Sequence, residues 1–345
     1  MTVRDNLNID SIETLLSPEA LKNKLPLSEA GSERVMNNRK AVEDILEHKS
    51  DRLMVIVGPC SIHNPEEAIE YAKRLKKLSD SVDDKLMIIM RVYFEKPRTI
   101  VGWKGLIYDP DLDESYKIGK GLEIARKLLL DIDELGLATG TEALDPVTTQ
   151  YIADLVSWAA IGARTTESQT HRQLVSGMSM PVGFKNTTDG SIQVALDAIR
   201  SSMHPHAFLG VLDNGNSGIF RTKGNQYSHI VLRGGSNGPN FGSEYISFTR
   251  ELMKKAGITP NIVVDCSHAN SGKKAANQVK VIEDLISQKI DGEKSIVGTM
   301  IESNLEFGTQ KVTDINSIKP GVSITDECIG WAETEKLILE MHAAL

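Results

Sequence analysis

Short apolar runs alternate along the chain with longer amphipathic stretches, and the first complete unit of this pattern lies at residues 53–67. Residues 53–57 are all apolar, which predicts a short buried strand. A glycine and Pro59 end that strand, because proline has no N–H group to donate to a sheet. Asn64 then caps a helix with a proline at its first position and acidic residues in its first turn. A buried strand, a polar tip and a helix form the unit of an α/β fold, which carries its chemistry at the tips.

The same alternation continues to the C-terminus and gives eight predicted strands, each followed by a helix. The strands are expected at 53–57, 86–92, 137–141, 158–163, 182–185, 208–212, 261–265 and 295–301. The helices are expected at 66–78, 117–135, 146–155, 170–178, 191–203, 243–256, 278–290 and 332–344. Residues 213–233 are punctuated by glycines and predict a β-hairpin inserted after strand six. Eight such units predict a (β/α)8 TIM barrel. An open doubly wound sheet is the alternative, but no Gly-x-Gly-x-x-Gly follows the first strand.

Residues 1–50 are polar and mostly helical, with one short helix starting at Ser17 and a second over 32–48. An arm before the first strand either covers the bottom of a barrel or reaches a neighbouring subunit. We favour the second alternative because Ile9, Ile12 and Leu15 need burial. The expected organisation is therefore an arm over 1–50 for oligomerisation and regulation, and a catalytic barrel over 51–345.

Composition narrows the function classes. The chain has 345 residues, of which 40% are hydrophobic and 25% charged, as in soluble globular proteins. A net charge of −8 argues against a nucleic-acid partner. Three cysteines without a CxxC pair fit a reducing compartment. The first residues lead into no apolar segment, so we expect no signal peptide, and no apolar run reaches the roughly 18 residues of a membrane span. We therefore expect a cytoplasmic enzyme.

The predicted strand ends carry two kinds of residue. Basic side chains are the first kind, and they are Arg91, Lys96, Arg98, Arg164, Lys185 and Arg233. Guanidinium forks and ammonium groups suit phosphate and carboxylate oxygens, so their gathering predicts a strongly anionic ligand. Each of these residues taken alone is more often a solvated charge.

The second kind could bind a divalent transition metal, and its members are Cys60, His268, Glu302 and Asp326. Carboxylate ligands with room for water favour a Lewis-acid site over a closed structural zinc site. Taken alone, a buried cysteine is mostly a small hydrophobe and a histidine a satisfied polar residue. Cys328 follows Asp326 by two residues, so a disulfide with Cys60 is expected when the protein is oxidised without metal.

Several segments together resemble the class I, aromatic-amino-acid-regulated 3-deoxy-D-arabino-heptulosonate 7-phosphate (DAHP) synthases over nearly the whole chain. These segments are Gly58-Pro59-Cys60-Ser61-Ile62-His63, Lys96-Pro97-Arg98-Thr99, Gly162-Ala163-Arg164-Thr165-Thr166-Glu167-Ser168, Gly183-Phe184-Lys185-Asn186, Leu232-Arg233-Gly234-Gly235, Asp265-Cys266-Ser267-His268-Ala269-Asn270 and Ile324-Thr325-Asp326. The resemblance implies condensation of phosphoenolpyruvate with erythrose 4-phosphate and water, the first step of the shikimate pathway that leads to the aromatic amino acids.

The resemblance also implies residue roles. One divalent ion, Mn²⁺ or Fe²⁺ with Co²⁺ or Zn²⁺ as further candidates, would bind at Cys60, His268, Glu302 and Asp326. Phosphoenolpyruvate would bind at Arg91, Lys96, Ala163, Arg164, Lys185 and Arg233, and the tetrose phosphate at Arg98 and Thr99. Lys185, Lys96, or a water held by Glu142 are the candidates for catalysis and proton transfer.

Members of this family bind an aromatic amino acid away from the catalytic face and assemble as tetramers, as dimers of dimers. The matching effector positions are Asn6, Asp145, Gln150, Ser179, Phe208, Gly210 and Phe220. Glycine at 210 leaves space for a phenol hydroxyl and favours tyrosine as the effector, although Leu212-Asp213 departs from the Thr-Lys of many relatives. The rival interpretations are a 3-deoxy-manno-octulosonate 8-phosphate synthase-like enzyme, a non-catalytic amino-acid-sensing barrel and a structural metal protein.

Overall fold

A closed parallel β-barrel forms the centre of the molecule in this computed structural model, which describes residues 5–98 and 100–345. The strand order around the barrel is β1-β10-β9-β8-β5-β4-β3-β2, and β1 pairs with both β10 and β2 to close it. The strands are β1 (Leu53–Gly58), β2 (Leu86–Arg91), β3 (Ala138–Glu142), β4 (Trp158–Ile161), β5 (Val182–Lys185), β8 (Ser228–Leu232), β9 (Ile262–Asp265) and β10 (Ile296–Glu302). Each is buried along its whole length, as expected for parallel strands covered on the outside by helices. The predicted (β/α)8 fold is confirmed.

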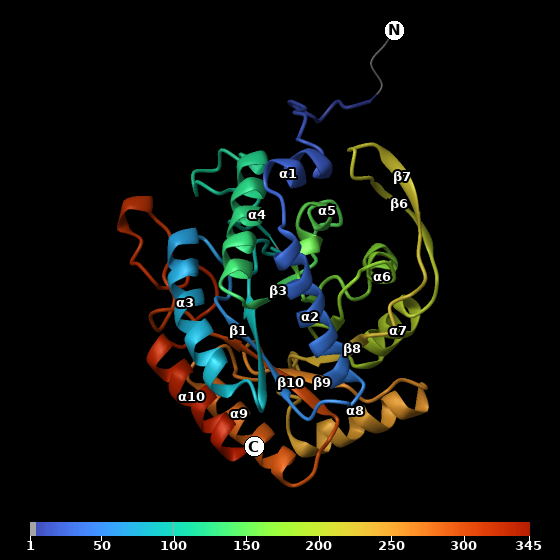
Figure 1. Ribbon diagram of the computed structural model, residues 1–345, viewed down its shortest axis with the longest axis vertical. Coiled ribbons are helices and arrows are strands. Elements are labelled where there is room, and N and C mark those ends of the chain that lie inside the picture. Colours follow the sequence, from blue (N-terminus) through green and yellow to red (C-terminus); the bar gives the residue numbers. More distant parts are fainter. Residues whose placement is uncertain (1–4, 99) are drawn as a thin grey trace.

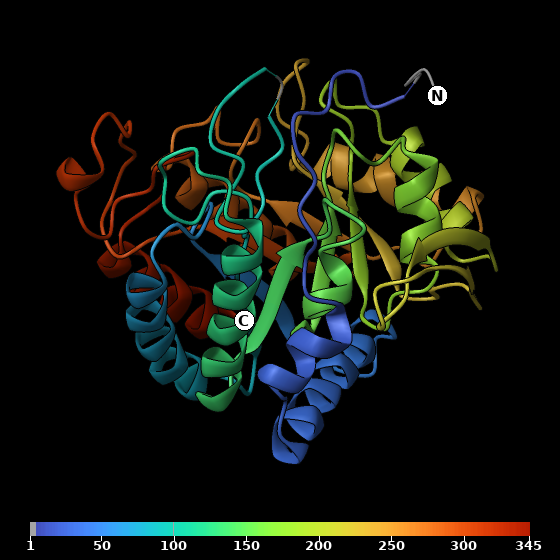
Figure 2. The ribbon, with the colours of Figure 1, turned by 90° about the horizontal axis from the view of Figure 1, so that it is seen from above.

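Helices surround the barrel (Figures 1 and 2). They are α3 (Pro65–Val82), α4 (Ile118–Glu134), α5 (Thr149–Ile152) with the 3-10 turn η1 (Ala153–Leu155), α6 (Gln169–Val175), α7 (Gln193–Ser202), α8 (Ser243–Lys255), α9 (Asn277–Ile290) and α10 (Trp331–Ala344). A further 3-10 turn, η2 (Ile315–Ser317), lies in the loop after β10. Asn64 caps α3 as predicted, since its side chain accepts hydrogen bonds from the first-turn N–H groups of Glu66 and Glu67. None of the described helices is long and apolar enough to cross a membrane.

The predicted hairpin exists, but its place and pairing differ from the prediction. Strand β6 (Ala207–Val211) pairs antiparallel with β7 (Ser217–Arg221), and this two-stranded ribbon lies outside the barrel. The sixth barrel strand is β8, which lies within residues 213–233, the range predicted to form the hairpin. The hairpin therefore precedes barrel strand six instead of following it. The burial pattern gives the reason, because β8 is buried throughout whereas β6 and β7 alternate between exposed and half-buried positions.

Of the N-terminal helices, α1 (Pro18–Lys24) contacts the hairpin and α2 (Glu29–Leu46) covers the bottom of the barrel. The N–H of Glu19 donates to the carbonyl of Asp213 at 2.8 Å, and Lys22 Nζ lies 2.7 Å from Asp213 Oδ1. Figure 1 shows this approach of the hairpin tip to α1. Asp213, one of the two residues predicted to depart from the Thr-Lys of many relatives, thus links the hairpin to α1.

Helix α2 closes the N-terminal end of the barrel with apolar side chains. Val42, Ile45 and Leu46 pack in one cluster with Met54 and Ile56 from the barrel interior. Each such burial stabilises the fold by about 2 kcal/mol. Part of the arm therefore covers the barrel bottom, which was the less favoured of the two alternatives.

The segment before α1 has no helix or strand over residues 5–16, and its apolar side chains are exposed in the single chain. Ile12 is 78% exposed, Ile9 51% and Leu15 41%. Their burial against a neighbouring subunit stays a prediction.

Candidate active site at the mouth of the barrel

Three of the four predicted metal ligands converge at the carboxyl ends of the strands. One donor atom from each of Cys60, Glu302 and Asp326 lies within 4.8 Å of the others. The register explains the approach of the first two, because Gly58 at the end of β1 pairs with Glu302 at the end of β10. Asp326 is brought back by the loop after β10, which is tied to the barrel by a bridge between Ser303 and Ile329. One thiol and two carboxylates are a donor set that fits a divalent transition metal.

The fourth predicted ligand, His268, stands at the edge of this group. Its Nε2 lies 4.0 Å from Glu302 Oε1, and its Nδ1 lies 2.9 Å from Asp265 Oδ2. The backbone of His268 has φ +53°, a left-handed conformation that is uncommon for a side chain of this size. The structure therefore places the imidazole beside the other three donors without bringing it into their tight group.

Burial and neighbouring charges set the ionisation of these donors. Burial, reinforced by Glu302, raises the pKa of the Cys60 thiol to about 11. Burial alone would also raise the pKa of Glu302, but His268, Arg91 and Lys96 outweigh it and lower that pKa to about 2. Arg91 Nη2 lies 3.2 Å from Glu302 Oε1. Glu302 is consequently ionised across the physiological pH range.

The predicted basic residues lie around the same mouth and differ in exposure. Arg91 is buried with its guanidinium 3.9 Å from the Tyr93 ring centroid, and Lys185 is buried with Nζ 2.8 Å from Asp265 Oδ2. Arg164 is exposed and Arg233 half-buried. Burial lowers the pKa of Arg233, and the charge of Arg164 contributes in the same direction. This crowding of like charge favours an anion between the two guanidinium groups.

Unpaired buried polar atoms mark the same region. Within the described residues, Arg91 Nη1, Tyr93 Oη and Glu142 Oε1 are buried without a hydrogen-bond partner. Buried polar groups in native proteins are nearly always hydrogen-bonded, so these atoms fit a site that is completed by a ligand or ordered water. Ala163, the remaining residue predicted to hold phosphoenolpyruvate, is half-buried beside Arg164.

Arg98, one of the two predicted tetrose-phosphate residues, borders an open cleft. Arg98 is exposed, and its Nε donates to the carbonyl of Trp103 at 2.8 Å. The cleft has a volume of about 1100 Å³ and is lined by Arg98 and Lys104 on one side and by Thr325 and Asp326 on the other. It therefore leads to the exposed member of the donor group. Thr99 lies outside the described residues.

The predicted effector positions are brought together only in part. Phe208 and Phe220 face each other across the hairpin as stacked rings with centroids 5.5 Å apart. Gly210 lies under the same ring, since a Cβ there would lie 2.8 Å from Phe220 Cε2. Asp145, before α5, accepts a hydrogen bond from the Tyr108 hydroxyl at 2.7 Å. Gln150 lies on α5, Ser179 lies between α6 and β5, and Asn6 is exposed in the arm.

Two polar residues of the site were not singled out from the sequence. Asp265 contacts both Lys185 and His268, and Ser267 Oγ donates to Glu302 Oε2 at 2.6 Å. Their signal was present, because Asp265 ends a predicted strand and Ser267 lies two residues beyond it. An acid and a serine at a strand end are too common to be selected without the neighbours that the fold supplies.

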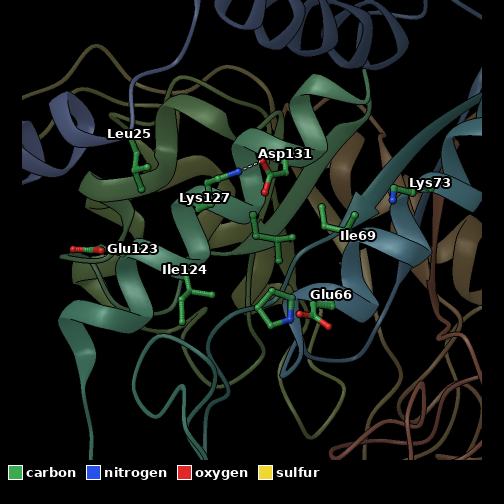
Figure 3. A pocket seen from close by; sticks show the side chains of 10 residues that line it. Leu25, Glu66, Ile69, Lys73, Glu123, Ile124, Lys127 and Asp131 are labelled. Atoms are coloured by element: carbon green, nitrogen blue, oxygen red, sulfur yellow. Dashed lines mark hydrogen bonds and ion pairs between the residues drawn. The ribbon is translucent and has the colours of Figure 1, made fainter.

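A separate groove lies on the outer surface between α3 and α4 (Figure 3). Ile69 and Lys73 line it from α3, and Ile124 and Lys127 from α4. No residue of the strand-end group lines this groove, so it is not part of the candidate active site.

The fold and the site together define a (β/α)8-barrel protein with a thiol–carboxylate donor group beside a basic, anion-seeking pocket. Comparison with known proteins narrows this class. The family model described as the DAHP synthetase I family matches residues 27–339. The chain belongs to this family, so the resemblance predicted from its motifs is confirmed, and it is an enzyme of the DAHP synthase class.

Individual relatives match over their whole length. The Tyr-sensitive phospho-2-dehydro-3-deoxyheptonate aldolase of Escherichia coli K12 is 49% identical over 342 residues, covering 99% of this chain and 96% of the relative. The Phe-sensitive enzyme of the same organism is 51% identical over 341 residues, covering 99% and 97%. A solved phospho-2-dehydro-3-deoxyheptonate aldolase from Francisella tularensis SCHU S4 superimposes with a TM-score of 0.95 at 47% identity, covering 98% of each chain. Relatives with different effectors are almost equally similar, so overall identity does not select the effector.

Proposed function

We propose that the chain condenses phosphoenolpyruvate with D-erythrose 4-phosphate and water to give DAHP and inorganic phosphate. The observation that carries this proposal is the convergence of Cys60, Glu302 and Asp326 beside the buried cations Arg91 and Lys185. Two phosphorylated substrates need several cations, and an aldehyde electrophile needs its oxygen polarised. Family membership agrees with both requirements.

Cys60, His268, Glu302 and Asp326 would hold one divalent ion, with Mn²⁺ or Fe²⁺ favoured and Co²⁺ or Zn²⁺ as further candidates. When bound, the ion supplies Lewis-acid polarisation of the aldehyde oxygen of erythrose 4-phosphate. The donor set supports a site with an open side, because Asp326 is exposed and borders the cleft that Arg98 lines.

Arg91, Lys96, Ala163, Arg164, Lys185 and Arg233 are proposed to hold the phosphate and carboxylate of phosphoenolpyruvate. Its C3 then forms the new C–C bond to the aldehyde carbon of the tetrose. Water adds to C2, and the C2–O bond to phosphate breaks, so phosphate leaves with the bonding electrons. Arg98 and Thr99 are proposed to hold the phosphate of the tetrose at the outer end of the cleft.

Lys185 is the proposed proton carrier of the reaction, with a water held by Glu142 as the alternative. Burial alone would lower the pKa of Lys185, but Asp265 and Tyr93 outweigh it and raise that pKa. The ammonium group can therefore donate a proton at neutral pH. Lys96 stays protonated for the same reason, because its pKa is raised by the Cys60, Glu302 and Asp326 charges against the effect of burial.

Feedback inhibition by an aromatic amino acid, with tyrosine favoured, is proposed at Asn6, Asp145, Gln150, Ser179, Phe208, Gly210 and Phe220. The glycine under the Phe220 ring supports the choice of tyrosine, since it leaves the most room around the stacked rings. Inhibition at a site distinct from the catalytic one requires a coupling free energy between the two sites.

Assembly as a homotetramer, a dimer of dimers, is also proposed. Exposed apolar side chains on the arm support it, and so do Leu209 at 80% exposed and Ile219 at 63% on the outer face of the hairpin. The arm over 1–50 is proposed to serve oligomerisation and regulation, and residues 51–345 catalysis. The cytoplasmic location remains a prediction, consistent with three free cysteines.

The test is phosphate release from phosphoenolpyruvate with erythrose 4-phosphate, with and without EDTA and with each aromatic amino acid. We expect release that EDTA abolishes and added Mn²⁺ restores. Arabinose 5-phosphate in place of erythrose 4-phosphate is the matched control. Phosphate release with arabinose 5-phosphate but not with erythrose 4-phosphate would assign the chain to the octulosonate-type reaction and overturn the proposal.

A further inference from the structure

One carboxylate oxygen at the end of β9 lies against two of the functional side chains. Asp265 Oδ2 lies 2.8 Å from Lys185 Nζ and 2.9 Å from His268 Nδ1. Lys185 comes from β5 and His268 from the loop after β9, so the two groups meet only at this oxygen. Asp265 itself is 1% exposed.

The rest of Asp265 is fixed by hydrogen bonds that leave Oδ2 for these two partners. Its Oδ1 accepts from the N–H of Ser267 at 3.1 Å, and its carbonyl accepts from Asn270 Nδ2 at 2.9 Å. These contacts hold the carboxylate in one orientation between Lys185 and His268.

We infer that Asp265 is a positioning residue that orients His268 toward the Cys60–Glu302–Asp326 group and Lys185 toward the substrate anion through the same oxygen. His268 Nδ1 lies 2.9 Å from Asp265 Oδ2 without the alignment of a hydrogen bond, and among the described residues it is a buried nitrogen that lacks a hydrogen-bond partner. We infer that Nδ1–H donates to this carboxylate when an ion binds at Nε2, because an imidazole that donates Nδ1–H to a carboxylate presents the lone pair of Nε2 to the ion. In this structure Nε2 is the nitrogen that faces Glu302. The inference rests on the proposed function and adds to it a shared determinant of metal and phosphoenolpyruvate affinity.

The local backbone supports this role. His268 is held at φ +53°, and its carbonyl accepts from the N–H of Lys273 at 2.7 Å. A non-glycine residue in this conformation persists where its surroundings over-determine it. Asp265 Oδ2 is near Nδ1 and Glu302 Oε1 is nearer to Nε2, so each ring nitrogen faces a different carboxylate.

The first test compares Mn²⁺ binding by the wild-type protein, Asp265→Asn and the control Asp133→Asn. The EPR signal of free Mn²⁺ measures the binding. Asp133 is a matched control because it is also a buried carboxylate paired with a cation, Arg34, but lies on α4 away from the mouth. Loss of a carboxylate behind a metal-binding histidine typically costs 10–100-fold in affinity. We expect Mn²⁺ binding weakened about 10–100-fold by Asp265→Asn and unchanged by Asp133→Asn.

The second test separates the two arms of the inference in a Lys185→Met background. With Lys185 gone, Asp265→Asn should still weaken Mn²⁺ binding through His268. It should no longer weaken phosphoenolpyruvate binding to the metal-free protein, which calorimetry measures. An Asp265→Asn effect on phosphoenolpyruvate that is equally large with and without Lys185 would overturn the shared role.

The outcomes distinguish this inference from the proposed function. Wild-type Mn²⁺ binding that is insensitive to Cys60→Ser would overturn the metal site and the inference with it. Normal wild-type binding together with identical affinities of Asp265→Asn and Asp133→Asn would overturn the inference alone.

Circular dichroism shows whether Asp265→Asn folds. If it does not, the imidazole ¹⁵N NMR spectrum of Zn²⁺-loaded wild-type protein shows which nitrogen of His268 binds the ion. Nε2 bound to the ion and Nδ1 carrying the proton is the expected result for His268. Zn²⁺ bound through Nδ1 would overturn the inference.

Discussion

Lys96 Nζ lies 3.1 Å from Cys60 Sγ and 3.3 Å from the Cys60 carbonyl oxygen, so an ammonium group sits against the proposed metal-binding sulfur. Its charge offsets part of the repulsion within the donor group. One carboxylate oxygen of Glu302 lies within 4.8 Å of one of Asp326. Two negative charges at that distance repel by about 3 kcal/mol at an effective dielectric constant near 20. The group is therefore built to attract a further cation.

The proposed proton transfer is tested by Lys185→Met. This change removes the ammonium group and leaves a side chain of similar length, so turnover at saturating substrates should fall about 10²–10⁴-fold. The matched control is Lys289→Met, because Lys289 is a half-buried lysine at the opposite end of the barrel, where its Nζ donates to the carbonyl of Ile296 at 3.0 Å. Steady-state phosphate release measures both, and unimpaired turnover of Lys185→Met would remove Lys185 from this role.

The effector proposal is tested at Gly210. A serine there would place Cβ 2.8 Å from Phe220 Cε2, so the ring must move. Overpacking of this kind costs about 1–3 kcal/mol, which corresponds to tyrosine inhibition weakened about 5–150-fold. Gly242→Ser is the control, since nothing lies within 4 Å of a Cβ at that position.

Inhibition curves with tyrosine, phenylalanine and tryptophan give the measurement. The wild-type protein should respond most strongly to tyrosine. A wild-type enzyme that tyrosine does not inhibit would contradict the effector choice, and equal curves for Gly210→Ser and wild type would contradict the place of the site.

Oxidation of the metal-free protein tests whether Cys60 and Cys328 lie close enough to form a disulfide. Cys60 and Cys328 are both buried free thiols, and burial, with a contribution from Cys60, raises the pKa of Cys328. We expect EDTA-treated protein to lose activity in air through a Cys60–Cys328 disulfide, and dithiothreitol to restore it. Cys328→Ser should keep its activity under the same treatment. Inactivation of Cys328→Ser at the wild-type rate, or loss that dithiothreitol cannot reverse, would argue against the pairing.

Acid destabilisation should report on His229, which lies 1% exposed in β8. Its Nε2 accepts from Trp158 Nε1 at 3.1 Å and its Nδ1 lies 3.0 Å from the Tyr227 carbonyl, which satisfies the neutral ring. Burial lowers the pKa of His229 to about 4, below the value of about 6.5 in an unfolded chain. Between these values the unfolded state binds more protons, so stability is full above pH 6.5 and falls as the pH falls toward 4.

Between pH 7 and pH 5 this histidine alone should cost about 2 kcal/mol of unfolding free energy. Urea denaturation at the two pH values measures the loss, and His229→Asn should show a smaller difference between them. His204→Asn is the control because His204 is exposed. A pH dependence of His229→Asn equal to that of wild type would show that His229 is not the source.

The sequence was sufficient for the barrel because its strands are fully buried, so apolar runs such as 86–91 stand out without their partners. It misplaced the hairpin because residues 208–212 and 228–232 are both short, largely apolar runs, and only the three-dimensional contacts show that the second one enters the barrel. The predicted donors Cys60, Glu302 and Asp326 meet because the strands are parallel and end at one edge.

The remainder of the site depends on contacts that no local pattern encodes. His268 is turned by a left-handed backbone and by Asp265, a residue whose partner Lys185 lies 80 positions away in the chain. Ile12 is exposed in the single chain, and the sequence alone does not specify which partner surface would bury it.

The central claim is that Cys60, His268, Glu302 and Asp326 hold one divalent ion beside the basic pocket. The most direct measurement is anomalous diffraction at the manganese edge from crystals soaked in Mn²⁺. The account expects one strong peak within bonding distance of the Cys60 sulfur, the His268 imidazole and the two carboxylates. A fully occupied peak elsewhere, with none between these four side chains, would contradict it.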